Sequence, residues 1–64
     1  MTAQSKYSAL IKETLAFREW PEGMTCAIFH GALATRWGMC RTEAERLQAM
    51  EEARAMFETV KNKP

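Results

Sequence analysis

The chain has 64 residues, of which 47% are hydrophobic and 27% charged, and this composition predicts one globular domain over residues 1–64. A chain of this length has room for a small helical fold, but not for a nucleotide-binding sheet or an enzyme barrel. Nine Lys and Arg against eight Asp and Glu leave a net charge of +1. A dedicated nucleic-acid binder normally carries a basic excess, so this balance disfavours that class without removing it.

Apolar side chains near the N-terminus approximate helical spacing and predict a first helix over residues 3–20. Thr2 is a suitable N-cap for this helix. Pro21 is expected to end it, because proline lacks a backbone donor and biases the preceding residue away from helical angles. The apolar positions of this segment are Tyr7, Leu10, Ile11, Phe17 and Trp20.

A second apolar stripe, at steps of three, four and four residues, predicts a helix over residues 24–37. Residues 24–29 alone also have strand propensity, and the alanines that follow favour the helix. Gly31 is costly inside a helix, which suggests close approach to a neighbour or a bend. Gly38 is expected to end the helix in a left-handed conformation. The residues of the stripe are Cys26, Phe29, Leu33 and Trp37.

The third predicted helix, residues 42–60, begins with the pattern S/T-x-x-E at Thr42 and Glu45. In this capping box each side chain satisfies a backbone donor of the other residue. Apolar residues then repeat at steps of three, four and three, as they do at the a and d positions of a coiled coil. These residues are Met50, Ala53, Phe57 and Val60. The expected fold class is therefore all-α, with three helices joined by short connections.

The third helix is longer than the second helix can cover, and this excess length suggests a homodimer. Two Trp, three Phe and five Met are a heavy apolar load for a chain of this size. Pairing with a second copy through the third helix buries such a load. The residues expected in the seam, within the chain or between copies, are Met50, Ala53, Phe57 and Val60. Further apolar anchors for a partner are Trp20, Trp37 and Met39.

Residues 33–47 resemble the core of a helix-turn-helix, in which a small residue lets two helices approach and a glycine makes the turn. The positions that match are Leu33, Ala34, Gly38, Met39, Ala44 and Leu47. This resemblance implies a DNA-binding regulator as the alternative function. The side chains available for DNA contacts are Arg36, Arg41, Thr42 and Arg46.

The third helix departs from a recognition helix because it is acidic. Five Glu against two Arg between residues 42 and 60 give this segment a net charge of −3. A recognition helix approaches the polyanionic backbone of DNA, so repulsion opposes the contact. DNA binding is therefore the less favoured function.

Neither a metal site nor catalysis is expected. Cys26 and His30 stand four residues apart and share a helix face, and Cys40 is available as a third ligand. A structural zinc site, however, usually has four protein ligands. Free thiols that pack as small hydrophobic groups are the simpler interpretation. The sequence contains no nucleophile–base set, no Gly-rich phosphate loop and no HExxH motif, so we predict a non-enzymatic protein without cofactors.

The size of the chain and its helical texture, rich in Trp, Met and Cys, resemble the short accessory proteins of lambdoid-phage early operons. This resemblance implies a small non-enzymatic protein that alters host physiology by binding a partner, often as a dimer. No targeting signal is visible, and the most apolar run, residues 24–34, is about half of a membrane span. We therefore predict a helical protein-interaction module in the host cytoplasm, a homodimer with an unidentified protein partner.

Overall fold

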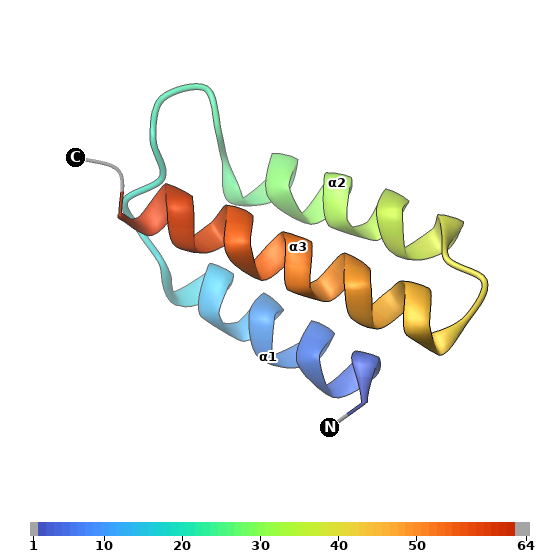
Figure 1. The fold of residues 1–64 in the computed structure, drawn as a ribbon. Coiled ribbons are helices and arrows are strands. Elements are labelled where there is room, and N and C mark those ends of the chain that lie inside the picture. The colour runs from blue at the N-terminus through green and yellow to red at the C-terminus, as the bar shows by residue number, and fades with distance from the viewer. Residues whose placement is uncertain (1, 63–64) are drawn as a thin grey trace.

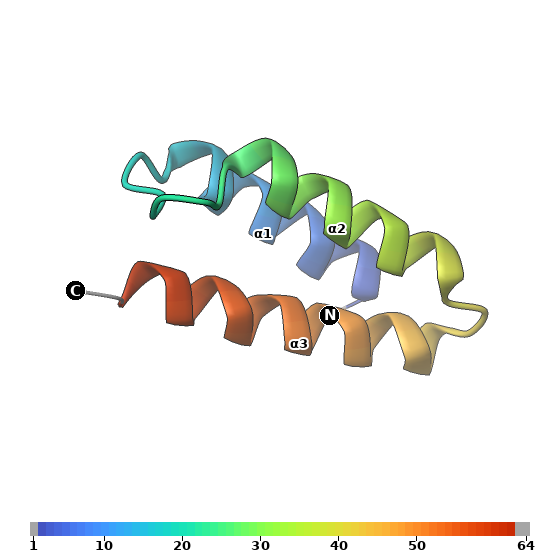
Figure 2. The ribbon, with the colours of Figure 1, turned by 90° about the horizontal axis from the view of Figure 1, so that it is seen from above.

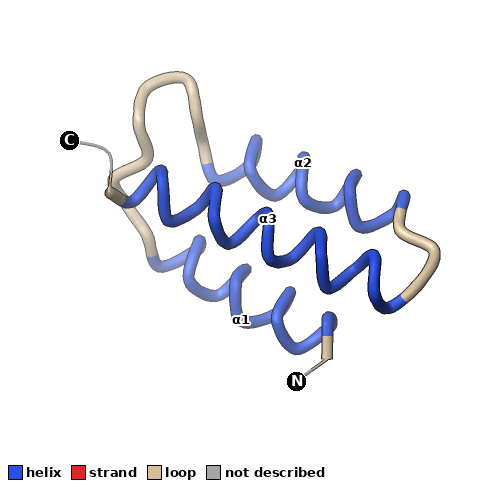
Figure 3. The backbone as a smooth tube through the Cα atoms, viewed as in Figure 1, coloured by secondary structure: helices blue, strands red, loops and turns tan. Residues whose placement is uncertain are grey.

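The computed structural model describes residues 2–62 and contains three helices (Figures 1 and 3). They are α1 (Ala3–Ala16), α2 (Cys26–Met39) and α3 (Glu43–Lys61). The predicted all-α fold of three helices is confirmed. None of these helices combines the length and the apolar character that a membrane span requires.

Successive helices run in opposite directions, so α1 and α3 are parallel and α2 is antiparallel to both (Figure 1). Seen from above, α1 and α2 form one layer over α3 (Figure 2). Two contacts hold α1 and α3 at a constant register. The Ala3 backbone N–H donates to Glu43 Oε2 at 2.9 Å, and Arg54 donates to both carboxylate oxygens of Glu13, with Nη1 2.8 Å from Oε1.

The core lies where the two layers meet. Each helix contributes apolar side chains from one face, as expected for amphipathic helices in a bundle. The side chains at its centre are Leu10, Phe29, Leu33, Met50 and Phe57. Phe57 is only 1% exposed, so the predicted apolar stripe of the third helix serves the interior of this chain.

The first helix is shorter than predicted, because it ends at Ala16 and not at Trp20. Phe17 leaves the helix in an extended conformation. Its ring and that of Trp20 then both reach Phe57, with ring centroids 5.5 and 5.7 Å away. Burial of two aromatic rings outweighs another helical turn, since aromatic side chains carry the largest apolar areas.

The excess length of α3 is covered within the chain. Because Ala3 lies beside Glu43, α1 ends level with the residues just before Phe57. Phe17 and Trp20, from the connection between α1 and α2, cover Phe57 beyond that point. The length of α3 therefore requires no second copy.

The second helix is displaced by two residues from the predicted segment. Thr25 caps it, with its Oγ1 accepting the Ile28 backbone N–H at 3.1 Å. Gly23, at φ +88°, makes the turn before the cap. Residues 26–39 are helical throughout, so the strand alternative is not realised. Gly38 lies inside the helix, which ends at Cys40 in an extended conformation and not in a left-handed one.

The caps of α1 and α3 were correctly predicted. Thr2 Oγ1 accepts the Ser5 N–H, and Thr42 Oγ1 accepts the Glu45 N–H, both at 3.1 Å. The second half of the capping box differs from its usual form, because Glu45 Oε1 accepts the backbone N–H of Arg41 at 3.2 Å. The side chain of Glu45 therefore fixes the turn before α3 as well as its first residues.

Replacing Phe57 with Ala should destabilise the fold by about 3–5 kcal/mol, because the change removes a buried ring and leaves a cavity. Urea unfolding followed by circular dichroism measures this loss. Met56→Ala is the matched control, because Met56 is the neighbouring side chain and is 53% exposed. Equal unfolding midpoints for the two variants would contradict the assignment of Phe57 to the core.

The Glu13–Arg54 contact should make stability depend on acid pH. The hydrogen bond from Arg54 lowers the pKa of Glu13 below its usual value. A lowered carboxyl pKa contributes stability above the unfolded value of about 4.3, and this contribution disappears as pH falls through the folded pKa. The pair is partly exposed, so we expect Glu13→Gln to cost about 0.5–1 kcal/mol at pH 7 and nothing near pH 2. An equal cost at both pH values would exclude this contribution.

Candidate interaction surface

The solvent side of α2, which faces away from the core residues Phe29 and Leu33, carries one charged side chain, Arg36, at its edge toward α3. The other eight exposed residues of this helix are uncharged. They are Ala27, Ile28, Gly31, Ala32, Ala34, Thr35, Gly38 and Met39. We call these eight residues the uncharged face. The exposed positions of α3, in contrast, include Glu43, Glu45, Glu51, Glu52 and Lys61.

Two long apolar side chains stand out from the uncharged face. Ile28 is 53% exposed and Met39 is 72% exposed, at opposite ends of α2. Large hydrophobic side chains exposed singly are common, but here they share a face with small and uncharged residues only. The face therefore presents an apolar strip along the whole helix.

Polar groups on the uncharged face are already satisfied. The one hydroxyl there, Thr35 Oγ1, donates to the Gly31 carbonyl oxygen at 2.9 Å. A Cβ placed on Gly31 or on Gly38 would meet nothing within 4 Å, so neither glycine is needed to let another part of residues 2–62 approach. The close approach predicted at Gly31 is not made inside the chain. Gly31 and Gly38 leave open notches in the strip.

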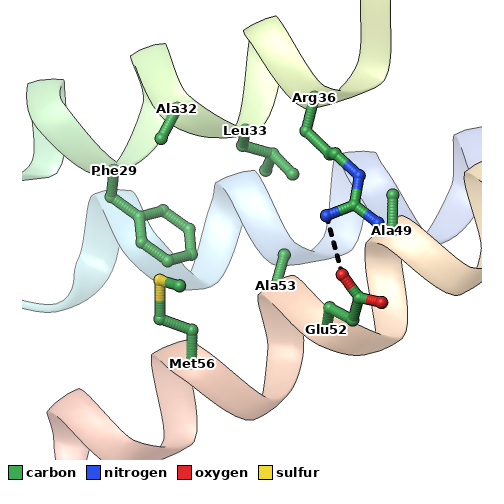
Figure 4. Close-up of a pocket in the computed structure, with 8 residues that line it drawn as sticks. All are labelled: Phe29, Ala32, Leu33, Arg36, Ala49, Glu52, Ala53 and Met56. Atoms are coloured by element: carbon green, nitrogen blue, oxygen red, sulfur yellow. Dashed lines mark ion pairs between the residues drawn. The ribbon is translucent and has the colours of Figure 1, made fainter. Parts of the chain in front are cut away.

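A groove of about 220 Å³ between α2 and α3 adjoins the uncharged face (Figure 4). Ala32 belongs to both, since it is exposed on α2 and also lines the groove. The walls are mainly apolar, with Phe29 and Met56 at one end and an ion pair at the other. The lining residues are Phe29, Ala32, Leu33, Arg36, Ala49, Glu52, Ala53 and Met56.

The ion pair at the groove keeps the only charge of α2 turned toward α3. Arg36 Nη1 lies 2.7 Å from Glu52 Oε1, and both side chains are about half exposed. The hydrogen bond to Glu52 raises the pKa of Arg36, while hydrogen bonds from Gln48 and then Arg36 lower the pKa of Glu52. Both groups therefore stay charged and paired near neutral pH. This pairing leaves the uncharged face without a competing cation.

The residues predicted to bind a partner are mostly used inside the chain. Met50 and Phe57 are buried, while Ala53 and Val60 are half-buried. Trp20 packs on Phe29 and Phe57, and Trp37 makes an edge contact with Tyr7 at 4.8 Å. Only Met39 of the predicted anchors is free to meet a partner.

The residues predicted for DNA contacts do not form one free basic surface. Arg36 is paired with Glu52, and the Thr42 hydroxyl caps α3. The guanidinium of Arg46 lies over the Trp37 ring, 5.1 Å from its centroid, while Arg41 is exposed. Moreover, α2 and α3 lie side by side as an antiparallel pair (Figures 1 and 2), whereas a helix-turn-helix sets its helices about 90–120° apart.

Only two of the three residues considered as metal ligands lie together, with Cys26 Sγ 3.4 Å from His30 Nε2. Cys40 follows Cys26 by fourteen residues, so the two stand about 21 Å apart along α2. Thr14 Oγ1 donates to the Ile11 carbonyl oxygen and lies 2.6 Å from His30 Nε2. The ring nitrogen of His30 nearest to Cys26 is therefore already in contact with the Thr14 hydroxyl. Within residues 2–62, no group of three or more metal-ligating side chains occurs.

Sequence reasoning missed the uncharged face, although a signal was present. Residues 24–35 contain no Asp, Glu, Lys or Arg, in a chain where 27% of residues are charged. An apolar helix without a clear polar side is usually buried all round. In this three-helix fold α2 is buried on one side only.

Comparisons with protein-family models, with curated proteins and with solved structures find no match for this chain.

Replacing Gly31 with Ala should stabilise the isolated chain by about 1 kcal/mol, because Ala is the better helix former and the added methyl group meets nothing. For a domain of this size, the melting temperature should rise by about 4–8 °C in dilute solution. Gly23→Ala is the control and should lower it, because Gly23 adopts a φ of +88°. Destabilisation by Gly31→Ala would show that Gly31 is not on an open face.

Proposed function

We propose that this chain is a non-enzymatic protein-interaction module whose contact surface is the uncharged face of α2. The observation that carries the proposal is that eight of the nine exposed residues of a fourteen-residue helix are uncharged, while the ninth, Arg36, is paired with Glu52 at the edge toward α3. Contiguous exposed apolar surface marks interaction sites in small proteins. A partner helix laid along α2 would cover Ile28 and Met39 and exclude water from the strip between them.

The groove beside α2 supports the same surface. A helix or extended segment on the uncharged face extends over Ala32 toward Met56, which is 53% exposed at the groove. Depletion of charge at the centre and polar groups at the edge are typical of interface cores. Here the edge is supplied by Arg36 and Glu52.

This proposal replaces the α3 seam with α2 as the contact surface. It keeps the role implied by the resemblance to phage accessory proteins, which is to act by binding in the host cytoplasm. DNA binding has less support, because Arg36, Thr42 and Arg46 are engaged in contacts within the chain.

Affinity capture with two matched variants tests the proposed surface. Thr35→Arg puts a charge at the middle of the uncharged face, and Ala55→Arg puts the same charge on an exposed position of α3. The tagged chain should retain at least one protein from its native cells, an untagged copy of itself included. Thr35→Arg should reduce this retention at least tenfold, and Ala55→Arg should leave it unchanged.

Equal retention by Thr35→Arg and the wild type would contradict the proposal. The same holds if the wild-type chain retains nothing. Circular dichroism of each variant establishes that it is folded before its binding is compared.

A further inference from the structure

The residues of the uncharged face are placed so that the face is complementary to itself. We propose that its occupant is a second copy of this chain, whose α2 lies antiparallel on the first about a two-fold axis level with Leu33. The inference rests on the proposed function and names its partner. In such an isologous interface the same patch is used by both copies.

An axis level with Leu33 pairs residues whose numbers add up to 66. Ile28 of each copy then faces Gly38 of the other, and Met39 faces Ala27. The two large exposed side chains, Ile28 and Met39, therefore meet the small residues of the partner helix. Closer to the axis, Gly31 faces Thr35. Large side chains facing small ones are what close packing of two helices requires.

Two other arrangements of paired α2 helices lack this match. In a parallel pair each residue faces its own copy, so Ile28 meets Ile28 while Gly31 meets Gly31 and leaves a gap. An antiparallel register moved by one turn, centred on Thr35, places Ile28 opposite Thr42, beyond the end of the partner helix. The register centred on Leu33 keeps both Ile28 and Met39 against small residues of α2.

Charge also permits the face to meet its own copy. A two-fold interface brings like charges together unless they are absent or paired, and the uncharged face has none while Arg36 is held by Glu52. The antiparallel arrangement places the N-terminus of each α2 near the C-terminus of the other, which is favourable for the helix dipoles.

The size of the face indicates a weak dimer. A helix of fourteen residues is about 21 Å long. A specific interface covers about a tenth of the surface of each small protein partner, and the surface of this chain is 4559 Å². The area buried on both copies together is therefore below about 1,200 Å², at the small end of the range for protein interfaces. We therefore expect a dissociation constant in the range of about 10–100 μM, which sets the concentrations needed for the test.

Sedimentation equilibrium of the full chain from about 5 to 500 μM tests the dimer. The wild-type mass should rise from one chain toward two. Gly38→Leu fills the notch opposite Ile28 and should raise the dissociation constant at least tenfold. Ala55→Leu adds the same side chain to the exposed side of α3 and should leave the constant unchanged.

A single-chain mass for the wild type at the highest concentration would overturn the inference, as would an unaltered constant for Gly38→Leu. The proposed function is judged separately, by whether capture depends on Thr35. A monomeric chain whose capture of another protein is lost with Thr35→Arg would refute the second copy and leave the contact surface standing.

Disulfide trapping tests the register. Gly31→Cys and Thr35→Cys are made separately in a chain that also carries Cys26→Ala and Cys40→Ala, each checked for folding by circular dichroism. Residue 31 of one copy faces residue 35 of the other across the two-fold axis, and a disulfide forms only where the two Cα atoms are a short distance apart. Oxidation of a mixture of the two variants should therefore yield mainly the mixed dimer. Predominance of the two symmetric dimers would overturn the antiparallel arrangement.

Discussion

A chain of three helices in two layers can bury only one side of each helix, and the properties of this molecule follow from that constraint. α3 satisfies this constraint, because it has charged residues on its solvent side and buries Met50 and Phe57 on the other side. α2 satisfies it poorly, because the one charged residue among its exposed positions, Arg36, lies at the edge toward α3 and the rest of its solvent side is uncharged. An apolar surface left in water is a source of free energy for association.

The aromatic cluster around Phe57 explains why this surface lies on α2 and not on α3. Phe17 and Trp20 leave the helical path after Ala16 and cover the part of α3 that α1 does not reach. The a/d stripe of α3 is thereby satisfied within one chain. On α2, in contrast, the strip between Ile28 and Met39 stays exposed, with its notches at Gly31 and Gly38.

Local signals predicted the three helices, since the hydroxyls at Thr2 and Thr42 cap their helices as expected. The end of α1 was not predictable, because the spacing of Phe17 and Trp20 fits a helix as well as an extended chain over Phe57. The uncharged face was not predictable from periodicity either. When a helix is apolar all round, only its neighbours decide which side meets solvent, and those neighbours are distant in sequence.

The most direct test of the account is a comparison of amide ¹H–¹⁵N spectra of the wild-type chain at low and high concentration, with and without the Thr35→Arg change. The account predicts that shifts with concentration are confined to α2, centred on residues 27–39, and vanish in the variant. The exposed side of α3, including Glu51 and Ala55, should give constant shifts. Shifts with concentration that are centred on α3 would contradict the claim that α2 carries the contact surface. The claim would also be contradicted if no shifts appeared at any concentration and none appeared when a captured partner was added.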